Sequence, residues 1–220
     1  MNTHNAIHLR AVDPAIVFTS CELMAAQEPR LAAAARSGPG SARPAARRRE
    51  VVVKGRRVKT IDVHAHCLIP EATKLLGQDA YKHHTGGIVL EDATARLRDM
   101  DAQGIDMEAL SINPFWYEAD RDTAAEVVRL NNEGLVEICA RNPDRFIAFA
   151  SVALQFPGLA AQQLEHAVKK LGLRGAAVGA SVGKDEFADP KFHPFWKTCE
   201  ELDVLVFLHP QGTPELARRL

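Results

Sequence analysis

The sequence predicts an α/β fold built on a parallel sheet, and three observations support this prediction. Short apolar runs alternate with helix-forming segments from about residue 58 onward. These runs are almost wholly hydrophobic, as expected of strands that helices cover on both faces. Polar residues gather where the runs end, which is the edge at which parallel α/β folds place their functional sites. Either a (β/α)8 barrel or an open doubly wound sheet fits this pattern.

The first predicted strand begins near Val58 and ends with the segment Ile61 to His66. Residues two apart on a strand point to the same face, so His64 and His66 direct two imidazoles to one spot. Two neutral imidazoles at a strand end can hold a divalent metal ion. Taken alone, a His-x-His pattern is weak evidence, because it also arises by chance.

Further strands and helices follow in alternation. We expect a helix ending near Gly104, because its apolar residues recur at helical spacing: Leu90, Ala93, Leu97 and Met100. Asp122 is the expected N-cap of the next helix, and prolines open the two after it, at Pro157 and Pro194. The remaining strands are predicted over residues 105–112, 146–152, 175–179 and 204–208.

Residues 1–57 differ in composition from residues 58–220, and we place a domain boundary between them. The first segment is rich in Ala, Gly, Ser, Pro and Arg, and no regular apolar period runs through it. Its arginines suit either a nucleic-acid or targeting arm or a flexible extension. The lack of interleaved aromatic residues favours the flexible extension. Near its end, Val51 to Val58 has the pattern of a small hairpin leading into the first strand.

The overall composition excludes several classes of protein. The chain has 220 residues, enough for one sizeable domain, and its formal net charge of −1 indicates neither nucleic acid nor an anionic membrane as a partner. No apolar run approaches the ~18 residues that span a bilayer. No glycine-rich phosphate-binding motif follows a predicted strand. Widely spaced cysteines indicate reduced thiols and a cytoplasmic location: Cys21, Cys67, Cys139 and Cys199.

His209 strengthens the interpretation of the first strand. It follows the fifth predicted strand directly, as His64 and His66 end the first. In a barrel these two strand ends face one another across the mouth, so three imidazoles would converge there. Such a donor set suits a catalytic zinc-type site with an open coordination position.

The chain also resembles the amidohydrolase superfamily, in the branch of aminocarboxymuconate-semialdehyde decarboxylase and γ-resorcylate decarboxylase. The resemblance covers about residues 58 to 215. Four motifs occur in the order and at spacings similar to those of this branch: His64-Ala65-His66, Met100 to Asp106, Arg141 to Phe146, and Leu208-His209-Pro210.

The resemblance implies a (β/α)8 TIM barrel with one divalent metal ion, usually zinc, held by His64, His66 and His209. It also implies an acid–base histidine and an aspartate after later strands, which we expect beyond Leu220. Only about five of the eight β/α units are predicted here, so the chain is expected to be the N-terminal part of a barrel. The first and fifth strands would then be open edges that expose apolar surface.

The resemblance further implies a metal-dependent decarboxylase-type lyase acting on a small carboxylated acid, aromatic or unsaturated, with dimers common in the family. A hydrolase or hydratase on the same scaffold, or an inactive fragment, are the alternatives. The stretch Lys82 to Val89 lacks the arginine that the muconate-semialdehyde enzymes use, which argues against that particular substrate. Asn113 and Trp116 follow the second strand and are the expected substrate-binding residues, although Trp116 would equally suit packing at the barrel rim.

Overall fold

The computed structural model describes residues 17–19, 48–77 and 93–209. Within them, five parallel strands follow one another in chain order: β4 (Ile61–Leu68), β5 (Met107–Ser111), β6 (Phe146–Ala148), β7 (Gly175–Gly179) and β8 (Leu205–His209). The strands β4, β5 and β6 pair in parallel, and so do β7 and β8. A parallel bridge between Ala150 and Ala176 joins the two groups. This is the strand order of a (β/α)8 barrel, of which these residues form about five units.

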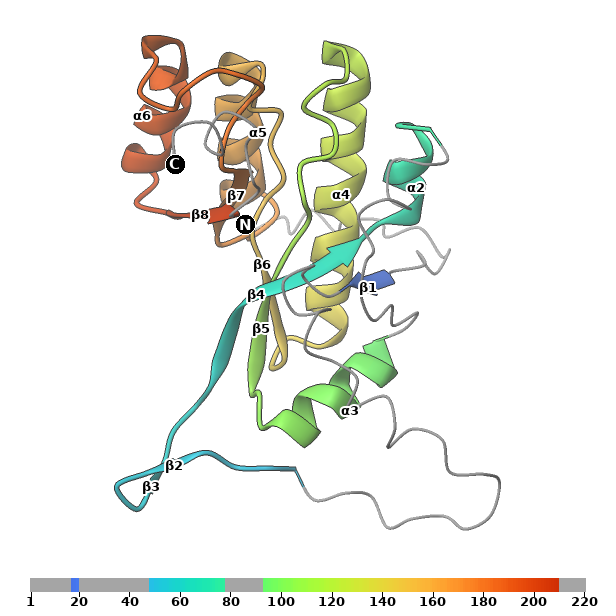
Figure 1. Cartoon of the computed structure of the whole chain (residues 1–220), viewed down its shortest axis with the longest axis vertical. Coiled ribbons are helices and arrows are strands. Elements are labelled where there is room, and N and C mark those ends of the chain that lie inside the picture. Colours follow the sequence, from blue (N-terminus) through green and yellow to red (C-terminus); the bar gives the residue numbers. More distant parts are fainter. Residues whose placement is uncertain (1–16, 20–47, 78–92, 210–220) are drawn as a thin grey trace, which may run out of the picture.

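Helices connect the strands and line one side of the sheet (Figure 1). They are α2 (Pro70–Lys74), α3 (Ala93–Gln103), α4 (Arg121–Arg141), α5 (Pro157–Lys169) and α6 (His193–Glu201), with a 3₁₀ turn, η2, over Pro190–Phe192. The helices α4, α5 and α6 stand side by side, and α5 packs against both of its neighbours. Because each helix returns the chain to the start of the next strand, successive strands are parallel. None of the described helices has the length and hydrophobicity to cross a bilayer.

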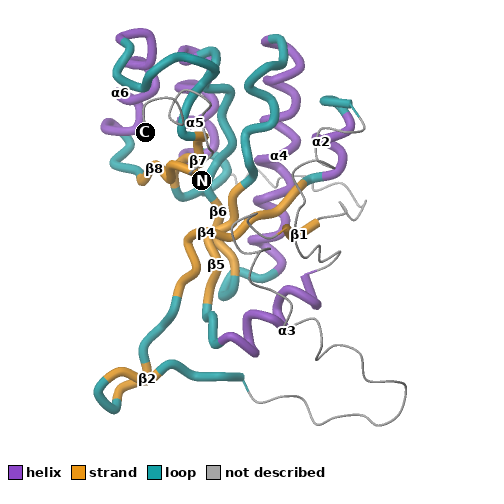
Figure 2. Tube along the Cα trace, viewed as in Figure 1, coloured by secondary structure: helices purple, strands orange, loops and turns teal. Residues whose placement is uncertain are grey.

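The chain before β4 adds three short strands. The strand β1 (Val17–Thr19) pairs antiparallel with the end of β4. The strands β2 (Val52–Val53) and β3 (Arg56–Arg57) form the predicted hairpin, which projects away from the helices (Figure 2). Lys54 and Gly55 take positive φ angles of 49° and 75°, as a tight two-residue hairpin requires. The proposed domain boundary between residues 57 and 58 stays a prediction.

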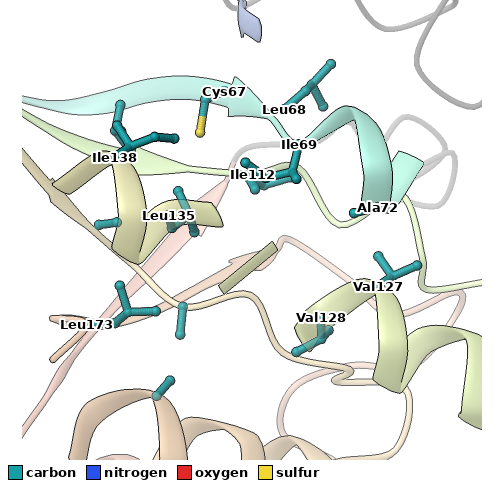
Figure 3. Packing of buried hydrophobic residues seen from close by; sticks show 14 of the residues in the cluster. Cys67, Leu68, Ile69, Ala72, Ile112, Val127, Val128, Leu135, Ile138 and Leu173 are labelled. Carbon is teal, nitrogen blue, oxygen red and sulfur yellow. The ribbon is translucent and has the colours of Figure 1, made fainter. Parts of the chain in front are cut away.

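The main core lies between the sheet and α4. Figure 3 shows Leu135 and Ile138 of α4 close to Cys67 of β4, within a cluster of buried apolar side chains. Gly134 of α4 packs closely against Ile69, the residue that follows β4. A Cβ atom at position 134 would lie 2.6 Å from Cδ1 of Ile69. The helix therefore fixes the point at which the chain leaves β4.

A smaller apolar cluster lies on the opposite, inner face of the curved sheet. Phe149 and Phe207 stack with their ring centroids 5.9 Å apart and their planes 9° from parallel. Ala109 and Ala177 pack beside them. Because side chains alternate along a strand, the residues two positions further along each strand also face inward. This places the carboxyl-terminal ends of the strands directly above the apolar cluster.

The predicted elements are largely confirmed, but several bounds differ. The first strand does not end at His66: β4 continues to Leu68, where it pairs with β1. Asp120, not Asp122, is the N-cap of α4: its carboxylate accepts the backbone N–H groups of Asp122 and Thr123 at 3.0 Å. The strand predicted over 146–152 ends at Ala148, because the chain beyond it pairs with β7 only through the single bridge at Ala150. Leu90 lies outside the described residues.

Apolar side chains are exposed on β8 and on the first half of β4, which β1 does not pair with. Ile61 and Val63 of β4 are 50% and 53% exposed, and Leu205 and Leu208 of β8 are 58% and 51% exposed. In a closed barrel such positions are covered by neighbouring strands and helices. These side chains are therefore candidates for contact with further polypeptide.

Candidate metal centre

Three histidines converge at the carboxyl-terminal end of the sheet. His64 and His66 lie on β4, and His209 is the last residue of β8. Each offers one ring nitrogen, and these nitrogens all lie within 4.8 Å of one another. The Nε2 atoms of His66 and His209 are 3.0 Å apart. The three rings thus lie together, as the sequence led us to expect, and their role as metal ligands stays a prediction.

The strands position these rings by simple alternation. His64 and His66 are two residues apart on β4, so both face the interior. On β8, His209 stands two residues beyond Phe207, whose ring centroid lies 5.5 Å from that of His64. Gly179 pairs with His209 across the β7–β8 ladder and has no side chain to compete for the same space. The histidines thus form a polar layer on top of the phenylalanine cluster.

The environment keeps His66 and His209 neutral. Burial is the largest effect and, together with the neighbouring histidines and Arg96, lowers the pKa of His66 to about 3. Burial and then His64 lower the pKa of His209 to about 4. Because both values lie well below 7, both imidazoles keep a free lone pair at neutral pH. A neutral imidazole is the form that ligates a metal ion.

Three ring nitrogens in this layer are buried and have no hydrogen-bond partner in the described part of the chain: His64 Nε2, His66 Nδ1 and His209 Nδ1. Buried polar atoms in native proteins are nearly always paired, so unpaired nitrogens at one place call for an explanation. A bound cation would take one nitrogen from each ring, and the 3.0 Å contact brings together Nε2 of His66 and Nε2 of His209. Of the three unpaired atoms, His64 Nε2 is therefore the one that such a cation would satisfy. Three imidazoles suit a divalent transition-metal ion that keeps an open coordination position.

Comparison with known proteins places the chain in a family. The amidohydrolase family model matches residues 61–219. The chain belongs to the amidohydrolase family. Among curated relatives, γ-resorcylate decarboxylase of Rhizobium radiobacter is 40% identical over 132 residues, and 2-amino-3-carboxymuconate-6-semialdehyde decarboxylase of Dictyostelium discoideum is 30% identical over 121 residues. These alignments cover 56% and 54% of this chain but only 40% and 34% of the relatives.

Solved structures of amidohydrolase relatives share the fold. A 2,6-dihydroxybenzoate decarboxylase from Rhizobium is 34% identical with a TM-score of 0.56, over 73% of this chain and 52% of that one. A dihydroxybenzoic acid decarboxylase from Polaromonas, solved with manganese and the inhibitor 2-nitroresorcinol, is 31% identical with a TM-score of 0.58 over the same shares. The chain therefore spans about half of these enzymes, and its five strands correspond to part of their barrels.

The loop after β5 of this amidohydrolase holds the other predicted site residues. Trp116 is fully buried in the main core, and its indole N–H donates to the carbonyl oxygen of Val152 at 2.9 Å. Tyr117 reaches the end of β7, where its hydroxyl accepts the backbone N–H of Gly179 at 3.3 Å. Asn113 is half-buried directly after β5. Trp116 thus has a clear packing role, and the substrate-binding roles of Asn113 and Trp116 stay predictions.

Sequence reasoning missed two serines of the amidohydrolase interior. Ser111 and Ser151 are 2% and 1% exposed, and within residues 17–19, 48–77 and 93–209 neither Oγ atom has a hydrogen-bond partner. The only available signal was position: Ser111 stands two residues beyond the small inward-facing Ala109.

Proposed function

We propose that this chain is part of a metal-dependent decarboxylase that acts on a small aromatic carboxylic acid bearing hydroxyl groups. The observation that carries the proposal is the convergence of three histidines, two of them held neutral, from β4 and from the carboxyl-terminal end of β8. The names of the relatives, γ-resorcylate decarboxylase and 2,6-dihydroxybenzoate decarboxylase, support the reaction and the substrate class.

His64, His66 and His209 would hold one divalent metal ion. Bound there, the ion would supply Lewis-acid stabilisation of negative charge on a coordinated substrate. The protein would contribute a fixed set of donor atoms. It would also exclude water from one side of the site, because Phe149 and Phe207 fill the space beneath the histidines. The acid–base histidine and the aspartate expected beyond Leu220 stay predictions, since this chain spans about 40% of the curated relatives.

Zinc is the ion that we propose from the three-imidazole donor set. Manganese is the alternative, because two related decarboxylase structures contain it: the Polaromonas enzyme and a 5-carboxyvanillate decarboxylase from Novosphingobium aromaticivorans, which is 28% identical. Softer imidazole ligands favour zinc, whereas additional carboxylate or water ligands favour manganese. Competition between the two ions decides which one the site prefers.

We also propose a cytoplasmic location and a homodimer. Three cysteines of the described chain, Cys67, Cys139 and Cys199, are free thiols, which suits a reducing compartment. The exposed apolar residues of β4 and β8 favour association with a second copy. Light scattering of the purified chain tests the dimer.

The experiment that tests the function has a binding part and a reaction part. The 220-residue chain and the variants His64→Ala and His209→Ala are titrated with Zn²⁺ and Mn²⁺, with His166→Ala as a matched control because His166 is exposed on α5. We expect one ion per chain for the unmodified protein and the control, and at least a tenfold weaker affinity in each site variant. Metal binding that persists unchanged in both site variants would overturn the proposed site.

The reaction part follows carbon dioxide release from 2,6-dihydroxybenzoate by the metal-loaded chain. Release that His209→Ala abolishes supports a decarboxylase. Metal binding without carbon dioxide release contradicts decarboxylation by these 220 residues alone and favours an incomplete enzyme. Turnover of an ester or amide panel without carbon dioxide release would favour a hydrolase.

A further inference from the structure

We propose that Ser111 and Ser151 bind the oxygen substituents of the substrate beside the histidine cluster, and that they select hydroxylated aromatic acids over unsubstituted ones. This inference rests on the proposed function and assigns substrate recognition to two residues of the same site. It starts from two buried hydroxyl groups that have no hydrogen-bond partner among the described residues.

Ser111 stands next to a proposed metal ligand. Its Cα is the register partner of His66 in the parallel β4–β5 pair. Paired residues of neighbouring strands project to the same face of a sheet, roughly 5 Å apart. The hydroxyl of Ser111 and the imidazole of His66 therefore share the inner face at the end of the sheet.

Ser151 occupies the corresponding place on the other side of the site. Phe149 and Phe207 stack on the inner face, and Ser151 and His209 each stand two residues further along the chain. By alternation both side chains project inward above the phenylalanine pair. Ser151 is as deeply buried as His66 and His209, at 1% exposure against 3% and 7%.

The backbone of Ser151 is held by a dedicated contact. Asn132, buried on α4, donates its Nδ2 to the carbonyl oxygen of Ser151 at 3.0 Å and accepts the N–H of Ser151 on Oδ1 at 2.8 Å. Both polar backbone groups of Ser151 are thus satisfied, although β6 has ended three residues earlier. Asn132 acts as a positioning residue: it fixes the serine and leaves the hydroxyl free.

Packing alone does not explain the two hydroxyls. The layer directly below is filled by Ala109 and Ala177, so a methyl group fits the inner face at comparable positions. A hydroxyl that is buried without a partner is less favourable than a methyl group of similar size. Two such hydroxyls in the layer of the metal ligands therefore indicate an external hydrogen-bond partner.

The chemistry of that partner follows from the hydroxyl group itself. A serine hydroxyl both donates and accepts, so it can pair with a phenol as well as with a carboxylate oxygen. The C–H edge of an unsubstituted ring would leave the buried hydroxyl unpaired. A site built to pair a substrate hydroxyl discriminates strongly against an analogue that lacks it. The two serines should therefore favour 2,6-dihydroxybenzoate over benzoate.

The test measures binding of these two acids to the manganese-loaded 220-residue chain by calorimetry. The variants are Ser111→Ala and Ser151→Ala, with Thr198→Ala as a matched loss of a hydroxyl on the exposed side of α6. We expect the preference for 2,6-dihydroxybenzoate to fall about tenfold in each serine variant and to stay unchanged in the control. Manganese stoichiometry, measured in parallel, should remain that of the unmodified chain.

The two proposals fail in different ways. An unchanged preference in both serine variants, with manganese still bound, would overturn the role of the serines and leave the proposed function intact. An unmodified chain that binds neither zinc nor manganese, and does not bind 2,6-dihydroxybenzoate, would overturn the proposed function and this inference with it. A loss of manganese in the serine variants alone would contradict the inference, because it would place the hydroxyls in metal binding.

Discussion

The Nε2 atoms of His66 and His209 lie 3.0 Å apart although 143 residues separate them in the chain. This contact, together with the ring contacts of His64 to Phe207 and His209, joins the first and fifth parallel strands. The proposed metal site therefore depends on the curvature of the sheet, and any change that moves β8 relative to β4 also changes the site. Two neutral imidazoles at this distance leave lone pairs available for a shared cation.

The lowered pKa values of these histidines predict that the metal-free chain loses stability in mild acid. The unfolded chain takes up protons on histidine as the pH falls below about 6.5, whereas folded His66 and His209 resist protonation until about pH 3 and 4. Their contribution to the free energy of unfolding is therefore fully present above pH 6.5 and is lost as the pH falls through that window. Urea midpoints between pH 7 and pH 5 measure the effect. A double variant, His66→Gln with His209→Gln, should show a shallower dependence, and an equally steep one would contradict the assignment.

A substitution at Gly175 should disturb the histidine site through the backbone of β7 and β8. Gly175 has a φ of +144°, and a Cβ atom there would lie 2.0 Å from the carbonyl oxygen of Leu205 on β8. Gly175→Ala should force β7 and β8 apart, lower the free energy of unfolding by about 2–4 kcal/mol and weaken manganese binding through displacement of His209. Thermal unfolding and metal titration test both effects.

Gly158→Ala is the matched control for this glycine. Gly158 lies in the first turn of α5, and a Cβ atom there meets nothing within 4 Å. Alanine restricts the unfolded chain without a clash, so stability should stay the same or rise by about 0.5 kcal/mol. If both variants have the same stability and the same manganese affinity, the close approach of β8 does not prevent a side chain at position 175.

The sequence was enough to predict which three histidines lie together, but not the distances between them. The inward direction of His64 and His66 follows from strand alternation alone, and the placement of His209 followed from the order of the strands. The 3.0 Å contact itself depends on curvature, which no short segment encodes. The same limit applies to Trp116, because its spacing could not show that its indole N–H would meet the carbonyl oxygen of Val152 inside the core.

The errors have equally local causes. Asp120 and Asp122 are both suitable N-caps, and only the extended backbone at Asp120, with φ −62° and ψ 168°, decides between them. Ser151 was missed because the amide that holds it, on Asn132, comes from a helix 19 residues earlier in the chain. Such a contact belongs to the tertiary structure and leaves no periodic signal in the sequence.

Asp106 is predicted to anchor the segment before β4 to the barrel. Its carboxylate accepts hydrogen bonds from the guanidinium groups of Arg48 and Arg57 and from the backbone N–H of Thr60. The Thr60 backbone bond comes first among the effects that lower the pKa of Asp106, followed among the favourable ones by Arg57. Asp106→Asn should lower the free energy of unfolding by about 1–2 kcal/mol, because hydrogen bonds to a charged group are replaced by weaker ones. Urea unfolding measures this, with Asp144→Asn as an exposed control that should change little.

Asn132 gives the most direct prediction about the end of β6. Asn132→Ala removes two buried hydrogen bonds and leaves the N–H and the carbonyl oxygen of Ser151 without partners. Since unpaired buried backbone groups are costly, the free energy of unfolding should fall by about 2–4 kcal/mol. Urea unfolding at pH 7 provides the measurement. The neighbouring substitution Glu133→Ala is the control, because Glu133 is exposed and pairs only with Arg129 among the described contacts, so its loss should change stability by less than about 0.5 kcal/mol.

A second measurement separates positioning from simple stability. If Asn132 holds Ser151 in place, Asn132→Ala should also reduce the preference for 2,6-dihydroxybenzoate over benzoate under conditions in which the variant is fully folded. Combining it with Ser151→Ala should then cost little further preference, because both changes remove the same contact to the substrate. Losses in preference that simply add, or a preference that stays at the unmodified value, would show that the amide supports the fold without directing the hydroxyl of Ser151.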